Sequence, residues 1–168
     1  LYRLKGYEIP EAGRTAKGTA IVNLLSLDNG EKVSAVIPIG VFADEKYLLM
    51  ATKNGLIKKT ALKEYDTVRK SGLQAITLKE DDELIGVRLT DGQDNVVLVT
   101  KKGMSITFSE KDVRPIGRVA QGVMGIRLDK DDAVIGMESI ISGSNATLLA
   151  ITENGFGKRT ELDEYRVQ

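Results

Sequence analysis

Apolar and polar positions alternate in short runs along the chain, and one arrangement of these runs occurs three times. In the first copy, residues 48–65, two apolar runs flank the turn Lys53-Asn54-Gly55. Asn-Gly between such runs predicts a β-hairpin with a two-residue type I′ turn, in which both central residues have positive φ. The turn glycines of the three copies are Gly55, Gly103 and Gly155, at spacings of 48 and 52 residues. A hairpin repeat with this period predicts an array of β-blades.

Each hairpin is followed by a polar connection and then by two more strand-like runs around an acidic turn. The connections end at Gly18, Gly72 and Gly122. The acidic turns are Asp28-Asn29-Gly30, Asp81-Asp82 and Asp131-Asp132. No helical periodicity lies between these runs, so we expect an all-β protein with four strands in each blade of about 50 residues. The expected blades, about three to three and a half, are residues 1–46 (a partial or first blade), 47–94, 95–145 and 146–168 (a partial blade).

The two ends of the sequence match the middle of the repeat rather than its limits. Leu1–Leu4 aligns with Ile57–Thr60, the arm that leaves the first hairpin, and Tyr165 aligns with Tyr65. We therefore expect a piece of a longer protein whose terminal units have unpaired strand edges. Such edges pair readily with other chains, so this piece is expected to self-associate through them. The alternative is that the terminal arms fray while the middle units hold the fold.

Cysteine and histidine are both missing, and each absence excludes some chemistry. The chain has no cysteine, which excludes disulfides and thiolate metal sites and fits a reducing compartment. It has no histidine, the commonest general base and metal ligand. No apolar run approaches the roughly 20 residues that span a bilayer, and no signal peptide opens the sequence. We expect a cytoplasmic protein that does not contact the membrane.

Charge is balanced overall but alternates in phase with the repeat. The chain has 24 Lys/Arg and 24 Asp/Glu, which gives no net charge. Residues 52–72 hold six basic and two acidic residues, whereas 79–94 hold two and six. Residues 100–122 hold five and two, and 123–138 hold two and four. Because equivalent positions of a repeat array lie on the same face, this alternation predicts one basic and one acidic surface.

The basic positions are candidate contacts for the phosphates of DNA. They are Arg3, Arg14, Lys17, Lys58, Lys59, Arg69, Lys70, Lys101, Lys102, Arg114, Arg118, Lys158 and Arg159. Such contacts need no base reading, and counterion release governs their affinity. We expect Lys58 and Lys59 to be exposed, so that replacing both weakens DNA binding without unfolding the chain. The alternative is an ordinary solvated surface.

No stretch of the chain predicts catalysis, a metal site or a cofactor. Asp129-Lys130-Asp131 resembles the start of a calcium loop but lacks the glycine and glutamate that should follow. Residues 155–160 contain Gly-Lys, but the first glycine and the Ser/Thr of a P-loop are missing. The equivalent tyrosines Tyr65 and Tyr165 are better explained as packing residues than as nucleophiles.

Several stretches resemble the C-terminal domain of the DNA gyrase A protein, in the same order and over the whole chain. They are YRLKGYEIPEAGRTAKGTAIVNLL, ATKNGLIKKTALKEYDTVRKSG, DELIGV, QGVMGIRL and ENGFGKRTELDEY. The related domain of topoisomerase IV is similar. The resemblance implies a β-pinwheel, a propeller-like ring or spiral whose neighbouring blades exchange strands. One departure is the absence of the Gln-Arg-Arg-Gly-Gly-Lys-Gly box, of which only Arg14, Lys17 and Gly18 are matched here.

The resemblance also implies a function. Such domains bind, bend and wrap double-stranded DNA around a basic rim without sequence preference, which supports negative supercoiling in the bacterial cytoplasm, on the nucleoid. The implied partners are the gyrase B protein and the rest of the gyrase A protein in an A2B2 holoenzyme, an ATP-dependent type II topoisomerase whose DNA-cleaving tyrosine lies in another domain. Two alternatives are the topoisomerase IV domain and a propeller-like scaffold that holds a peptide in an apolar groove. An enzyme on a propeller is disfavoured by the missing histidine and cysteine.

Overall fold

The computed structural model describes residues 1–67, 69, 71–141 and 143–168. Its strands are β1 (Tyr47–Thr52), β2 (Leu56–Ala61), β3 (Leu84–Thr90), β4 (Asn95–Thr100), β5 (Ser105–Ser109), β6 (Val123–Met124), β7 (Val134–Ile140), β8 (Thr147–Ile151) and β9 (Gly157–Glu161). Its 3-10 turns are η1 (Gly6–Glu8), η2 (Ile21–Asn23), η3 (Leu62–Tyr65), η4 (Glu110–Asp112) and η5 (Leu162–Glu164). The described residues contain no α-helix, which confirms the all-β class, and none of their helical turns is long and apolar enough to cross a membrane.

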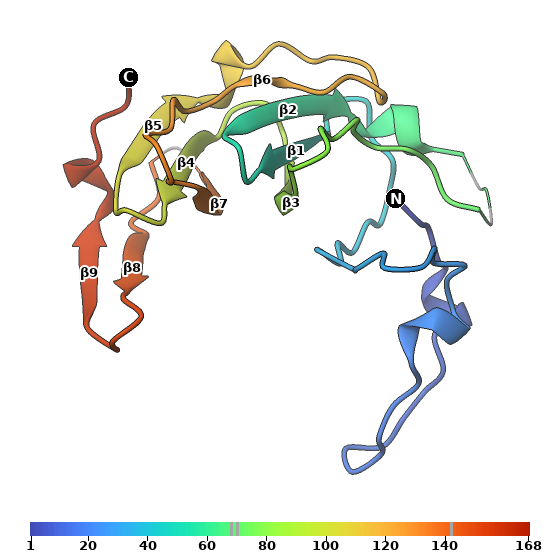
Figure 1. Cartoon of the computed structure of the whole chain (residues 1–168). Helices are drawn as coiled ribbons and strands as arrows, with labels where there is room; N and C mark the ends of the chain where they lie inside the picture. The colour runs from blue at the N-terminus through green and yellow to red at the C-terminus, as the bar shows by residue number, and fades with distance from the viewer. Residues whose placement is uncertain (68, 70, 142) are drawn as a thin grey trace.

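In the described part of the chain the strands form three antiparallel sheets along an arc (Figure 1). Their strand orders are β3-β1-β2-β6, β5-β4-β7 and β8-β9. Strand β6 follows β5 in sequence but completes the first sheet, where Val123 pairs with Ile57 of β2. This exchange of a strand between neighbouring units is the β-pinwheel arrangement. Strands β2 and β6 lie on the convex side of the arc, and β3 and β7 lie on its concave side (Figure 1). The blade limits 47–94 and 95–145 stay a prediction.

All three predicted hairpins are present, but their turns are not of type I′. The Gly55 N–H donates to the carbonyl oxygen of Thr52 at 3.0 Å, and Gly55 alone in this turn has positive φ, 85°. The ladder ends at the pair Ala51–Ile57, which leaves a longer loop than a two-residue turn. A type I turn followed by a left-handed glycine fits this loop, and it places no demand on Asn54.

The same turn geometry occurs in the other two hairpins, and all three turns contain a threonine whose role the apolar pattern did not predict. The Gly103 and Gly155 N–H groups donate to the carbonyl oxygens of Thr100 and Thr152 at 3.0 and 2.9 Å. In each turn the threonine Oγ1 also accepts a hydrogen bond from the backbone N–H four residues later. The repeat is therefore Thr-x-x-Gly, and the threonine closes the loop that the glycine bends.

Strand β1 supplies both hydrophobic core clusters, because successive side chains of a strand face opposite sides. The first cluster lies between the first two sheets and contains Leu49, Ala51, Ile57, Val96, Leu98, Phe108, Val113, Val134 and Met137. The second contains Leu48, Met50, Leu62 and Tyr65. Because both faces are covered, residues 48–51 of β1 are all apolar rather than alternating with polar residues. Tyr65 is buried as predicted for a packing residue.

The strands expected in residues 1–46 and 73–79 are absent, which corrects the prediction of four strands in every blade. Residues 21–23 form the 3-10 turn η2 instead of a strand. Leu73 makes a short backbone pairing with Leu1, through hydrogen bonds of 2.7 and 2.8 Å, where a longer ladder was expected. A strand forms only beside a partner backbone, and among the described residues 33–39 have none. Ile37 and Ile39 still pack against the second core cluster.

Candidate nucleic-acid interface

The connection of residues 112–122 places two of the candidate cations, Arg114 and Arg118, over strand β2. This connection runs along β2, where the Ile116 N–H donates to the Lys59 carbonyl oxygen at 2.8 Å. The Thr60 hydroxyl donates to the Ile116 carbonyl oxygen at 2.9 Å. The segment is therefore held in a fixed register on the convex side of the arc (Figure 1). Arg114 is exposed and Arg118 is half-buried.

Lys58 and Lys59 are buried, so the expectation that both are exposed is wrong. The Lys58 side chain is 0% exposed, and its Nζ donates to the carbonyl oxygens of Ala75, at 2.7 Å, and Arg118. Lys59 is 4% exposed, and its Nζ donates to the Glu110 carbonyl oxygen. The reason is that β2 lies inside its sheet and the connection covers it. A polar position in a strand pattern does not distinguish a solvated face from one covered by other backbone.

Burial changes the ionisation of both lysines. It lowers the pKa of Lys58 to about 8; the nearby carboxylate of Glu64 opposes this shift, and the positive charge of Arg118 adds to it. Burial also lowers the pKa of Lys59, against the attraction of Glu110 and Asp112. These amines thus act as hydrogen-bond donors to neighbouring backbone, and they are not available to a phosphate in this structure.

Most of the other candidate cations are exposed. The exposed ones are Arg14, Lys17, Arg69, Lys101, Lys102, Arg114, Lys158 and Arg159. Arg3 is half-buried, because it pairs with Asp66 at 2.8 Å and lies over the Phe42 ring at 4.2 Å from its centroid. Lys70 lies outside the described residues.

The lysines at the hairpin turns lie beside the acidic turns, so the predicted separation of basic and acidic surfaces does not extend to them. The Lys102 N–H donates to Asp132 Oδ1 at 3.0 Å, and its Nζ donates to the Lys130 carbonyl oxygen. The Lys101 N–H donates to the Ala133 carbonyl oxygen. These lysines therefore share their end of the sheet with several carboxylates, which weakens their attraction for phosphate.

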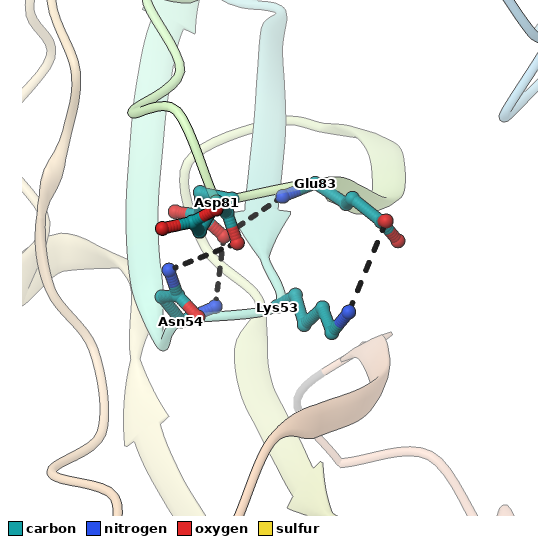
Figure 2. Close-up of polar contacts among 5 residues, drawn as sticks. Lys53, Asn54, Asp81 and Glu83 are labelled. Carbon is teal, nitrogen blue, oxygen red and sulfur yellow. Dashed lines mark hydrogen bonds and ion pairs between the residues drawn. The ribbon is translucent and has the colours of Figure 1, made fainter.

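The first hairpin has the same arrangement (Figure 2). Asp82 Oδ1 accepts the N–H groups of Asn54 and Glu83, both at 2.9 Å, and Lys53 Nζ lies 3.8 Å from the Glu83 carboxylate. Asp82 is 6% exposed, so it braces the hairpin and is not a free surface charge. In the second hairpin, desolvation opposes ionisation of Asp132, but hydrogen bonds from Thr100 and two backbone N–H groups lower its pKa.

An acidic trio was not anticipated from the sequence. The carboxylates of Asp91, Asp94 and Glu110 each have an oxygen within 4.8 Å of the others. Glu110 is fully buried and accepts hydrogen bonds from the Thr90 hydroxyl, at 2.7 Å, and the Asp94 N–H, at 2.8 Å. Burial, with a contribution from Glu110, raises the pKa of Asp94. The repeat did not predict a buried acid at Glu110, because the equivalent positions in the other two hairpins are Leu62 and Leu162.

A shallow apolar depression lies between β7 and β8, where the scaffold alternative would require a peptide groove. It is lined by Ile140, Ile141, Leu148 and Leu162, among others. Leu148 and Leu162 are equivalent to Leu48 and Leu62, which belong to the second core cluster. The depression is thus a partly covered counterpart of that core cluster, and it offers no specific support for a peptide site.

Comparison with known proteins identifies a consistent set of relatives. The family model described as "DNA gyrase C-terminal domain, beta-propeller" matches residues 1–39, 46–91, 94–141 and 146–168. The DNA gyrase A protein of Clostridium acetobutylicum is 55% identical over 168 residues, which is 100% of this chain and 20% of that protein. The corresponding protein of Haloquadratum walsbyi is 44% identical over 172 residues, again 100% of this chain and 20% of the relative.

Two solved structures are similar along nearly the whole chain. The C-terminal domain of DNA topoisomerase IV has a TM-score of 0.87 and 34% identity, over 96% of this chain and 50% of that one. The DNA gyrase A C-terminal domain has a TM-score of 0.80 and 27% identity, over 98% and 52%. The chain thus spans about a fifth of the length of the relatives named above and about half of these two solved domains.

Proposed function

The chain belongs to the DNA gyrase C-terminal domain family, and from this premise we propose that it binds double-stranded DNA without sequence preference, and bends and wraps it. The observation that carries the proposal is that exposed cations recur on equivalent connections. Arg14 and Lys17, then Arg69, then Arg114 each precede the glycine that ends their connection, and all four are exposed. The three connections end at Gly18, Gly72 and Gly122, about 50 residues apart, and such recurring cations suit DNA because its phosphates recur along the duplex.

Contacts of this kind suit a bent duplex. Bending a site of 20–30 base pairs costs on the order of 1–6 kcal/mol, so many weak contacts along a curved surface are needed. The connection of residues 112–122 lies on the convex side of the arc (Figure 1). Histone octamers hold bent DNA by the same combination of backbone contacts and deformability.

We extend the proposal to the whole protein by analogy with the family. In it this chain supports negative supercoiling by an ATP-dependent type II topoisomerase in the bacterial cytoplasm, with the gyrase B protein and the rest of the gyrase A protein in A2B2 as partners. The chain itself contributes DNA binding, and the DNA-cleaving tyrosine belongs to another domain. The corresponding protein of topoisomerase IV is the second candidate, favoured by the TM-score of 0.87 to its C-terminal domain.

A salt titration with random-sequence duplexes of increasing length tests the proposal. Log K should fall linearly with log salt, with a slope of about −0.9 for each contacted phosphate, and the slope should grow with duplex length until the surface is filled. A flat salt response, or a strong preference for one short sequence, contradicts it. Relaxing circular DNA in the presence of the chain tests wrapping, because a wrapped duplex shifts the linking number and one that is bound without bending does not.

A further inference from the structure

Both polar backbone atoms of Arg118 are held by charged side chains of the preceding hairpin. Glu64 Oε2, on the turn η3, accepts the Arg118 N–H at 3.0 Å. Lys58 Nζ, on strand β2, donates to the Arg118 carbonyl oxygen. Lys58 is buried, whereas Glu64 is exposed. The two side chains therefore hold the two peptide groups that flank the Arg118 Cα, one each.

The segment that precedes Arg118 is held as well. The neighbouring Ile116 is tied to the backbone of Lys59 and the hydroxyl of Thr60, so the segment before Arg118 is also fixed. The Arg118 guanidinium forms none of the ion pairs found in the described part of the chain. An arginine with an anchored backbone and an unpaired, half-exposed side chain can contact an anion at a smaller entropic cost than one on a mobile loop.

We propose that Lys58 and Glu64 are positioning residues that fix Arg118 for contact with a DNA phosphate. This inference rests on the DNA binding proposed above. It gives the two residues an indirect role: neither touches DNA, and both act through Arg118. It also means that a hairpin of one unit sets the geometry of a DNA contact carried by the next unit, so that successive contacts are mechanically linked.

The charge of Glu64 makes its role separable from simple electrostatics. A carboxylate next to a phosphate-binding arginine repels DNA, so removing its charge alone should preserve or slightly improve binding. Glu64→Gln removes the charge but keeps an oxygen that can accept the Arg118 N–H. Glu64→Ala removes both the charge and the acceptor. The difference between these two variants reports on the hydrogen bond alone.

The test is a double-mutant cycle on DNA affinity, measured with a random-sequence duplex and the whole 168-residue chain. With Arg118 present, Glu64→Ala should bind about three- to tenfold more weakly than Glu64→Gln, the range for one net hydrogen bond. In an Arg118→Ala background the two variants should bind equally. Equal affinities with Arg118 present, or a difference that persists without it, overturn the role of Glu64. Glu153→Ala, an exposed acidic residue in the turn between β8 and β9, is the control for charge removal.

The role of Lys58 is tested in the same way with Lys58→Met. We expect this variant to weaken binding only when Arg118 is present, measured at a temperature where circular dichroism shows it folded. Losses that add to those of Arg118→Ala overturn the role of Lys58. If Lys58→Met does not fold, the comparison of Glu64→Ala with Glu64→Gln decides the proposal. If Arg118→Ala leaves DNA affinity unchanged while the chain still binds duplex DNA, this inference fails and the proposed function stands. If the unaltered chain shows no salt-dependent binding to duplex DNA, the proposed function itself fails.

Discussion

The amine of Lys58 is buried away from water. Its amine donates to two backbone oxygens, but no carboxylate forms an ion pair with it in the described part of the chain. Burial lowers its pKa to about 8, below the usual value of about 10.4 for an unfolded lysine. Between these two values the unfolded state binds more protons, so the free energy of unfolding rises with pH.

From pH 7.5 to 9.5 the wild-type chain should gain on the order of 1 kcal/mol in the free energy of unfolding relative to Lys58→Met. Urea unfolding curves at both pH values measure the difference, and Lys58→Met cancels the contributions of all other groups. The same pH dependence in both chains would show that the amine is solvated.

The hairpin turns differ in how closely they pack against the following unit. Gly55 and Gly103 have nearly the same φ, 85° and 84°, but different surroundings. A Cβ on Gly55 would lie 2.6 Å from the Ile126 carbonyl oxygen, whereas a Cβ on Gly103 would meet nothing within 4 Å. The first turn therefore packs against residues that precede β7, and the second is open.

These two glycines form a matched pair of variants. Gly103→Ala should cost about 1–2 kcal/mol of stability, from the left-handed backbone alone. Gly55→Ala should cost clearly more, because its neighbour is backbone and cannot move aside as a flexible side chain can. Thermal or urea unfolding of both variants measures the gap. Equal losses would mean that the first turn and residue 126 are not in contact in solution.

Sequence patterns predicted where the hairpins lie better than they predicted which segments cover them. The spacing of Gly55, Gly103 and Gly155 located all three hairpins, because a turn is determined by nearby residues. The same reasoning placed Lys58 in solvent, because what covers β2 is a segment 60 residues further along the chain. It also expected strands in residues 19–39, where the apolar pattern is present but a partner backbone is not. Local patterns thus predict strands and turns, and long-range pairing decides which faces are exposed.

The charges that surround each exposed cation rank the candidate DNA contacts. Arg69→Ala and Arg114→Ala together should reduce the salt slope of DNA binding by about 2, since each removes one phosphate contact. Lys101→Ala and Lys102→Ala together remove the same charge, but beside carboxylates, and should change the slope less. Salt titrations of the two double variants provide the comparison. An equal effect would show that DNA follows the hairpin turns as well as the connections.

The last sheet predicts how this chain behaves at high concentration. Strand β8 pairs only with β9 among the described residues, and it exposes Leu149, at 61%, and Ile151, at 68%. An open edge with apolar side chains is a template for pairing, so the chain should self-associate. Light scattering over a wide concentration range measures this, and Leu149→Lys should shift the equilibrium toward monomer. A monomer at every concentration, with both termini protected from hydrogen exchange, contradicts the prediction.

The exchange of β6 into the first sheet has a consequence for synthesis on the ribosome. The amine of Lys58 is not covered until Arg118 has been made, 60 residues later, and the edge of β2 stays open until Val123 follows. A unit therefore cannot finish folding when its own residues have emerged, and must wait for its successor. Distant pairings of this kind slow folding and leave edges exposed meanwhile. Each unit should therefore complete its folding only after the next unit has been synthesised. Until then, the unpaired strand edge of the last unit made stays exposed.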